Sequence, residues 1–153
     1  MKHIKIFFVL MLLAAGINLK AQTKPAFTKY KVPPLYTQLG GLRDSISIPV
    51  NEAENIIGQA LKVFDNKKGL YTISSYQFLY RKKGVTENEE TGKVSPITSI
   101  VSSRFKITPL PGTWVTQVRE QLKSGEELFF FDVIAKDAQG RVMYAPNLKI
   151  MVK

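Results

Sequence analysis

Carboxylates are the residues of this chain that could carry acid–base chemistry. Asp132 lies inside an apolar segment, where a carboxylate can act as a general acid or base if a second positioned group assists it. The neighbours Glu126 and Glu127 could contribute to a glycosidase pair, whose carboxyl groups must lie ~5 to 9.5 Å apart. Both glutamates stand in a turn segment, so we expect them to be solvated. We interpret Asp132 as structural, at a sheet margin or bonded to a backbone donor or a lysine.

A second acidic cluster stands in the polar segment 84–93, and aromatic residues offer a different chemistry. The cluster lacks the alternating Asp/Asn ligands and the spacing of a calcium loop, so we expect its residues to be solvated. Aromatic side chains could stack on a sugar or an aromatic ligand, although most such side chains fill cores. The acidic cluster consists of Glu87, Glu89 and Glu90, and the aromatic candidates are Trp114, Tyr71, Tyr76 and Tyr80.

The chain has one histidine, His3, and no cysteine. Because His3 lies in a segment that we expect to be removed, the mature protein contains neither residue type. This composition excludes Ser-His-Asp and Cys-His catalysis, thiol redox chemistry, disulfides, and zinc or copper sites built from imidazole or thiolate. We therefore predict a protein that is not an enzyme and that needs no cofactor.

Residues 1–21 have the pattern of an export signal peptide. Lys2 and Lys5 precede an uncharged apolar run over residues 6–15, and Ala21 is a small residue at the expected cleavage point. The alternative is an uncleaved anchor, but the run is shorter than the ~20 apolar residues of a spanning helix. We predict cleavage before Gln22 and a protein in the periplasm or outside the cell, with no transmembrane segment after cleavage.

Removal of the signal leaves 19 basic residues against 12 acidic ones, so the net charge falls from +10 to +7. A basic surface can attract nucleic acid, an acidic polysaccharide or an anionic membrane. The basic residues are scattered, with Lys67-Lys68 and Arg81-Lys82-Lys83 as the only runs, and no RNA-binding signature accompanies them. We expect some attraction to an acidic partner and no binding of nucleic acid.

Residues 22–34 are predicted to be an extended leader because three prolines disfavour helix there. One domain is predicted over residues 35–153, with a strand over residues 45–48. Residues 51–65 then follow the helical period, with Asn51 as the N-cap of a predicted helix. Gly58 weakens that helix, and a strand pair interrupted near Gly58 is the competing interpretation.

The second half of the chain has the alternation of strands. Residues 70–83 and 97–107 are predicted to form a long hairpin, with a bulge or bend at Ser74-Ser75 where the first strand changes its buried face. A short helix is expected over residues 113–123, containing Trp114 and ended by Gly125. Residues 127–136 are apolar on both faces, which is typical of a strand inside a layered structure.

A turn ending at Gly140 and two short strands over residues 141–144 and 147–152 complete the predicted sheet. The predicted fold is mainly β, an Ig-like or related β-sandwich with one or two short accessory helices. Phe130, Phe131 and Asp132 in its most apolar strand are expected to be structural, as are Trp114, Gly125 and Gly140.

The last half of the chain resembles the C-terminal domain of the GldM/PorM family, the periplasmic protein of the gliding-motility and type IX secretion motor. The similarity lies in "LKSGEELFFFDVIAKDAQGRV" followed by "LKIMV", and in "YTISSYQFLY" at residues 71–80. The matching positions are Leu122, Lys123, Gly125, Asp132, Val133, Ala135, Asp137 and Gly140.

The resemblance implies a stand-alone copy of the distal module, the part of the family that contacts outer-membrane-associated partners. Members of the family have a transmembrane helix at the start and several periplasmic domains, whereas this chain has a cleavable signal and room for one domain. It therefore cannot be the energy-transmitting shaft, and the family supplies no catalytic residues.

These observations predict a non-catalytic periplasmic interaction module that docks through a sheet face or edge, as an accessory of gliding, type IX secretion or another envelope assembly. The alternative is a β-sandwich that binds a small ligand or a glycan. We place partner binding on the hairpin segment 81–93, which carries no core residue apart from Val85 and is expected to change without loss of the fold. Its candidate residues are Arg81, Lys82, Lys83, Glu87, Glu89 and Glu90.

Overall fold

The computed structural model describes residues 30–153, of which Val32–Lys153 form one compact unit. The predicted signal peptide, residues 1–21, lies outside the described residues, as does the predicted leader up to residue 29. The first strand begins at Leu35, where the sequence predicts that the folded domain starts.

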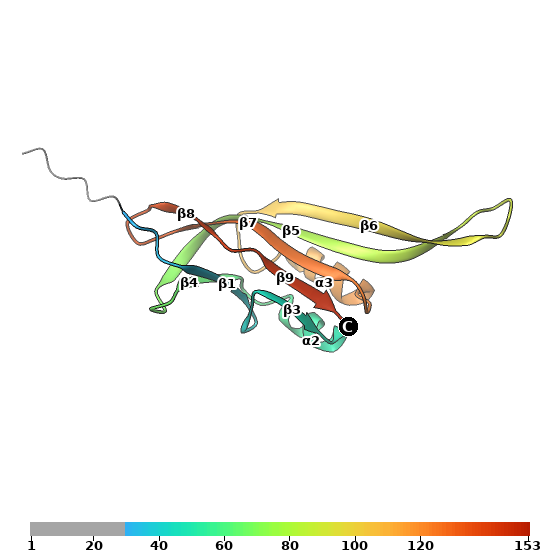
Figure 1. The fold of residues 1–153 in the computed structure, drawn as a ribbon, viewed down its shortest axis with the longest axis horizontal. Helices are drawn as coiled ribbons and strands as arrows, with labels where there is room; N and C mark the ends of the chain where they lie inside the picture. Colours follow the sequence, from blue (N-terminus) through green and yellow to red (C-terminus); the bar gives the residue numbers. More distant parts are fainter. Residues whose placement is uncertain (1–29) are drawn as a thin grey trace, which may run out of the picture. The chain divides into compact units, whose positions relative to one another are not determined.

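Nine strands and two helices make up the described part of the chain (Figure 1). In chain order they are β1 (Leu35–Leu39), β2 (Leu42–Arg43), β3 (Ser45–Ile48), α2 (Val50–Ile56), β4 (Lys62–Asp65), β5 (Leu70–Glu87), β6 (Val94–Phe105), α3 (Gly112–Gln121), β7 (Glu127–Lys136), β8 (Val142–Ala145) and β9 (Leu148–Val152).

The strands form one mixed sheet in the order β2-β1-β4-β5-β7-β9-β3, with β6 added to β5 and β8 added to β7. The ladder between β3 and β9 is parallel, and the other ladders are antiparallel. The Thr37 hydroxyl of β1 donates a hydrogen bond to the carbonyl of Pro146, between β8 and β9, at 2.5 Å. This contact draws β1 towards the other end of the sheet, so the sheet curls into an almost closed β-sandwich.

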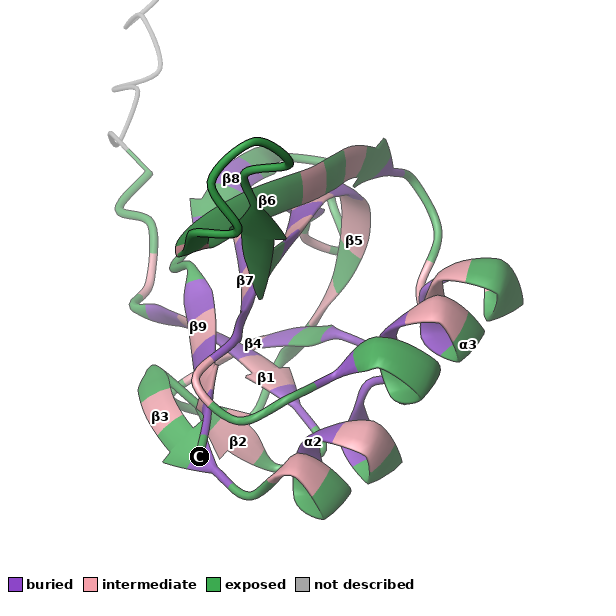
Figure 2. Cartoon of the chain, turned by 90° about the vertical axis from the view of Figure 1, so that its right-hand side faces the viewer, coloured by how far each residue is buried: buried purple, intermediate pink, exposed green. Residues whose placement is uncertain are grey.

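The inner face of this curled sheet and the two helices enclose one hydrophobic core (Figure 2). Phe78 of β5 and Phe130 of β7 pack with their ring centroids 4.9 Å apart. The ring of Trp114 on α3 packs edge-on against Phe78 at 5.7 Å and against Phe105 of β6 at 5.4 Å. The chain is therefore a mainly β sandwich with two short helices among its described residues, which confirms the predicted fold class.

The helix predicted over residues 51–65 is wrong in its extent. The helix α2 ends at Ile56, and residues 62–65 form β4, which pairs with β1 and β5. Pro49, not Asn51, is the N-cap residue. A Cβ added at Gly58 would lie 3.0 Å from Arg119 Nη2 and 3.4 Å from Val115 Cγ1, so α3 crosses the chain closely at this point. Tertiary packing and strand pairing thus override the helical period beyond Ile57. The competing interpretation of a strand pair interrupted near Gly58 is wrong too, because the segment before Gly58 is the helix α2.

The predicted hairpin of the two long strands is confirmed, and it extends further than the prediction. Twelve residue pairs join β5 to β6, from Tyr76↔Phe105 to Glu87↔Val94. The ladder between β5 and β7 changes register between Ile73 and Ser75 and again before Gln77. The irregularity predicted at Ser74-Ser75 is therefore present.

The strand β7 differs from its predicted pattern at Asp132. The alternation of the sequence places Val133 on the face opposite Phe130, yet both side chains are buried in the same core. Asp132 has φ +48 and is the extra residue of a bulge, which shifts every later side chain to the other face. The outer face of β7 therefore carries Phe129 and Phe131, which are only half-buried and whose rings stack at 5.1 Å.

Candidate functional site

The β5–β6 hairpin extends well beyond the part that the core requires. The ladder between β5 and β7 ends at the pair Arg81↔Glu127, whereas the ladder between β5 and β6 continues for six more pairs. Residues 82–99 therefore form a two-stranded ribbon, which we call the arm, whose strands pair with no other strand of the described part of the chain. Figure 1 shows the arm in yellow-green and yellow, projecting past the helix α3.

Apolar side chains on the arm face solvent. Val85 is 70% exposed and Val94 is 57% exposed, and both lie on the face of the ribbon that continues the outer face of the sheet. Ile97 is exposed on the opposite face, across the ladder from Gly84. These residues contribute nothing to the buried core, so their exposure needs an explanation other than folding.

The turn at the tip of the arm is held by Asn88. Its side-chain oxygen accepts hydrogen bonds from the backbone N–H groups of Glu90 and Thr91 at 3.1 and 2.9 Å, and from the Thr91 hydroxyl at 2.9 Å. The predicted acidic residues Glu87, Glu89 and Glu90 gather at this exposed tip. The tip is thus a defined, acidic turn.

The root of the arm is fixed to the body by two buried glutamates, of which Glu127 is one. Its side chain receives Arg81 Nη1 at 3.3 Å and Lys149 Nζ at 3.2 Å, and the residue is 5% exposed. Glu127 therefore joins β5 to β9 across β7. Removal of either cation would leave a buried carboxylate with one partner fewer.

Glu126 holds the root from the inside and is 2% exposed. Its Oε2 atom accepts hydrogen bonds from the Tyr80 hydroxyl at 2.5 Å and from the Lys123 N–H at 2.9 Å, and its Oε1 atom accepts one from the Lys83 N–H at 3.0 Å. Burial, with the hydrogen bond to Glu126, raises the pKa of Tyr80, so the phenol remains the proton donor. The expectation that Glu126 and Glu127 are solvated is wrong, because both are buried. Glu126 is bonded to the core residue Tyr80, and Glu127, the first residue of β7, is covered on the outer face of the sheet by Arg81 and Lys149.

The three basic residues predicted to bind a partner lie at the root of the arm rather than at its tip. Arg81 is committed to Glu127, and the Lys82 ammonium donates to the side-chain oxygen of Gln121 on α3. Lys83 is exposed, although its backbone is bonded to Glu126. We therefore expect Arg81 to be an exception to the tolerance predicted for segment 81–93, because its partner Glu127 is buried.

Asp132 lies on the exposed outer face of the sheet rather than in a catalytic pocket. Its Oδ2 atom accepts a hydrogen bond from the Gln77 amide at 2.5 Å and lies 3.8 Å from Arg104 Nη2. The bonding partners are a glutamine and an arginine, where the sequence suggested a backbone donor or a lysine. Asp132 thus ties the bulge of β7 to β5 and β6.

The remaining residues predicted to be structural occupy defined positions. Gly125 has φ +84, and a Cβ there would lie 2.8 Å from Lys83 Nζ, so a side chain would be strained and crowded. Gly140 has φ +79 in the turn before β8. Phe130 is buried, whereas Phe131 is half-buried on the outer face.

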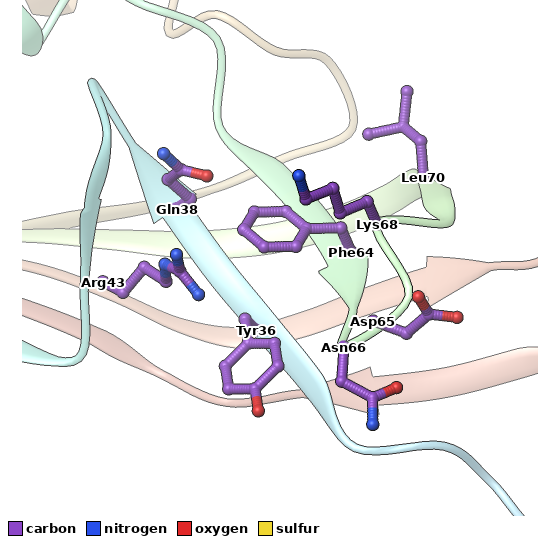
Figure 3. A pocket seen from close by; sticks show the side chains of 8 residues that line it. All are labelled: Tyr36, Gln38, Arg43, Phe64, Asp65, Asn66, Lys68 and Leu70. Carbon is purple, nitrogen blue, oxygen red and sulfur yellow. The ribbon is translucent and has the colours of Figure 1, made fainter.

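A shallow groove of about 580 Å³ lies on the outer face of β1, β2 and β4 (Figure 3). The guanidinium carbon of Arg43 stands 5.6 Å from the ring centroid of Tyr36 and 5.3 Å from that of Phe64. Gln38 and Asn66 add amide groups to its lining. Sequence reasoning missed this groove, because it assigned Phe64 to the core face of a helix.

One carboxylate at the end of this groove is structural. Backbone hydrogen bonds, first that of Gly69 and then that of Lys67, lower the pKa of Asp65, and the Tyr71 hydroxyl adds a third bond at 3.1 Å. Of the predicted stacking residues, Tyr71 serves this loop, while Tyr76 and Tyr80 are buried. The burial of Tyr76 and Tyr80 agrees with the expectation that most of these aromatic side chains fill the core.

The described residues contain no cluster of three carboxylate or histidine groups placed to hold a metal ion. Neither helix in this part of the chain is long and apolar enough to cross a membrane. No protein-family model and no curated protein matches the chain.

Proposed function

We propose that this protein is a non-catalytic interaction module of the cell envelope that docks onto another protein through its arm. The observation that carries the proposal is the arm itself, a ladder that continues past the body and holds Val85, Val94 and Ile97 in solvent. Exposed apolar side chains on a regular ladder do not stabilise an isolated protein, because they stay in contact with water. They stabilise a complex when a partner covers them.

The anchoring of the root supports a mechanical connection between the arm and the body. On β5, Arg81 is bonded to Glu127, the first residue of β7, and both Tyr80 and Lys83 are bonded to Glu126, the residue before it. A partner bound to the arm would therefore act on the body through a fixed root. Such an arrangement suits a docking module better than an enzyme, because each of these carboxylates already has its donors.

The resemblance to the GldM/PorM C-terminal domain supports a place in a gliding, type IX secretion or other envelope assembly, with an outer-membrane-associated protein as partner. The signal-peptide pattern supports export to the periplasm or beyond. Mass spectrometry of protein from the native host is expected to find a chain that begins at Gln22. A full-length chain embedded in the membrane would overturn the export proposal.

The docking proposal is tested by shortening the arm. In the test variant an Asn-Gly turn replaces residues 85–96, so that the pair Gly84↔Ile97 becomes the last of the ladder. Envelope proteins crosslinked to the wild-type protein are identified, purified and rebound to both forms. We expect stoichiometric binding by the wild type, loss of binding by the shortened form, and equal melting temperatures. Equal binding by both forms would contradict the proposal.

The groove at Arg43 favours a second candidate function, the binding of a glycan that carries acidic groups. Tyr36 and Phe64 offer apolar faces to a sugar ring, and the guanidinium between them can bind a carboxylate. Titration calorimetry with uronic-acid oligosaccharides and with neutral ones tests this function. Saturable binding of the acidic sugars that Arg43→Ala abolishes would support it, and equal heats for both sugars would exclude it.

A further inference from the structure

The two long edges of the arm differ in chemistry. The β5 edge carries Lys82, Lys83, Gly84 and Glu87, which are residue types that natural sheets use to prevent edge pairing. The N–H group of Lys83 on this edge is already bonded to Glu126. The β5 edge is thus protected against the addition of another strand.

The β6 edge has almost no such protection. From residue 94 to residue 103 it carries ten uncharged residues, rich in Ser, Thr, Val and Ile. Within residues 30–153, β6 pairs with no strand other than β5. Pro96 is the one residue of this stretch that hinders the addition of a strand, and it removes at most one hydrogen-bond donor from the edge. A twelve-residue edge of this composition can add a further strand along most of its length.

We propose that β6 pairs edge to edge with β6 of a second copy of this chain, in antiparallel orientation about a two-fold axis at Ser99. This inference rests on the proposed function, because it takes the arm to be the docking element, and it names the partner of one arm edge. The joined arms would form a four-stranded ribbon, and both copies would use the same surface patch.

The side-chain pattern suits this register. With Ser99 opposite Ser99 of the second copy, like faces of the two ribbons stay together, and Ile97 lies opposite Val101 of the second copy. The symmetry creates this apolar pair twice and covers Ile97, which is 45% exposed in one copy. Residues 94–103 carry no charge in either copy, so pairing along this stretch brings no like charges together.

The charges at the two ends of β6 select the antiparallel orientation. Arg104 and Lys106 stand at the body end, while the tip holds Glu87, Glu89 and Glu90 against one lysine, Lys93. Antiparallel pairing brings the acidic tip of each copy beside the basic body end of the other. Parallel pairing would place tip beside tip and lose this complementarity.

The absence of cysteine from the chain makes the pairing directly testable. Directly opposite residues of an antiparallel pair have Cα atoms about 4.5–5.5 Å apart, within the separation of about 4.4–6.8 Å that a disulfide spans. The Ser99→Cys variant of the exported protein is therefore expected to form a disulfide-linked dimer under mild oxidation. Thr86→Cys is the matched control, because Thr86 is exposed on β5 and is separated from the axis by β6.

Light scattering on the wild-type protein is expected to give twice the monomer mass. The Ile97→Lys substitution is expected to raise the dimer dissociation constant about tenfold or more, because the two-fold symmetry places the substitution at two contacts of the interface. Gly84 lies opposite Ile97, so the new lysine side chain is placed against no other side chain of its own hairpin. The melting temperature of the monomeric variant serves as the control for folding. A monomeric wild type at every concentration, or equal crosslinking of Ser99→Cys and Thr86→Cys, would overturn the pairing.

Failure of the pairing and failure of the docking function give different results. A monomeric protein that loses its envelope partner when the arm is shortened would overturn the pairing and retain the docking function. A dimer crosslinked at Ser99→Cys whose shortened form still binds the envelope partner would support the pairing and contradict the docking function.

Discussion

The Tyr80 hydroxyl donates a hydrogen bond of 2.5 Å to Oε2 of Glu126, and both residues are almost completely buried. The two residues lie 46 positions apart in the sequence, so their contact joins the root of the arm to the start of the central strand. The backbone donors of Lys83 and Lys123 complete the environment of the carboxylate. Glu126 thus organises the junction between the arm and the body.

Substitution of Glu126 by alanine is expected to destabilise the protein by about 3 kcal/mol or more, because it leaves the buried Tyr80 hydroxyl and two part-buried backbone N–H groups without their acceptor. Urea denaturation measures this loss. Glu120→Ala, on the exposed surface of α3, is the matched control and is expected to change the free energy of unfolding by about 0.5 kcal/mol or less. Similar losses for the two variants would show that Glu126 does not organise the junction.

Stability is expected to fall at alkaline pH because of Tyr76. Burial raises the pKa of Tyr76 to about 12, and its hydroxyl donates to the Ile107 carbonyl at 3.0 Å. Above the pKa of about 10 that tyrosine has in the unfolded chain, the unfolded state releases a proton that the folded state retains. The stabilising contribution is therefore complete below pH 10 and is lost as the pH rises towards 12.

Denaturation curves from pH 8 to about pH 11 measure this dependence. Tyr76→Phe is expected to reduce the slope of stability against pH, even though it also removes a hydrogen bond. Tyr144→Phe, which changes an exposed side chain, is the control. A slope that Tyr76→Phe leaves unchanged would refute the assignment.

The two neighbouring phenylalanines of β7 are expected to differ in their contribution to stability. Phe130 is 1% exposed and packs on Phe78 and Tyr76, so Phe130→Ala is expected to cost about 3–5 kcal/mol. Phe131 is half-buried beside Phe129 on the outer face, so Phe131→Ala is expected to cost about 1 kcal/mol. Chemical denaturation compares the two, and equal losses would mean that the outer face is covered in solution.

Charge reversal is expected to act differently at the two ends of the arm. Arg81→Glu sets a carboxylate against buried Glu127 and is expected to cost about 2 kcal/mol, since Lys149 remains as a partner. The triple change of Glu87, Glu89 and Glu90 to lysine affects exposed side chains and is expected to leave the melting temperature nearly unchanged. Calorimetric scans distinguish the two, and a large loss in the triple variant would contradict an independent tip.

The sequence by itself determined the elements whose patterns are local and long. The alternation of β5 and β6 specifies a hairpin, the glycines and prolines mark its ends, and the absence of cysteine excludes disulfides. Residues 113–123 have the spacing of a helix, and α3 occupies Gly112–Gln121, although its N-cap residue is Pro111, which has no side-chain acceptor for the first-turn N–H groups. These features follow from the pattern of apolar and polar residues that lie close together in the sequence.

Only the tertiary structure decided which side chains are buried and which elements meet. The apolar period of residues 51–65 suits a helix, but α3 packs against Gly58 and β1 offers a ladder, so Lys62–Asp65 become a strand and Phe64 reaches the groove beside Tyr36. One bulge at Asp132 moves Val133 into the core and leaves Phe131 outside. Strand pairing, bulges and the burial of Glu126 and Glu127 depend on contacts between residues far apart in the chain. Local sequence patterns do not predict such contacts.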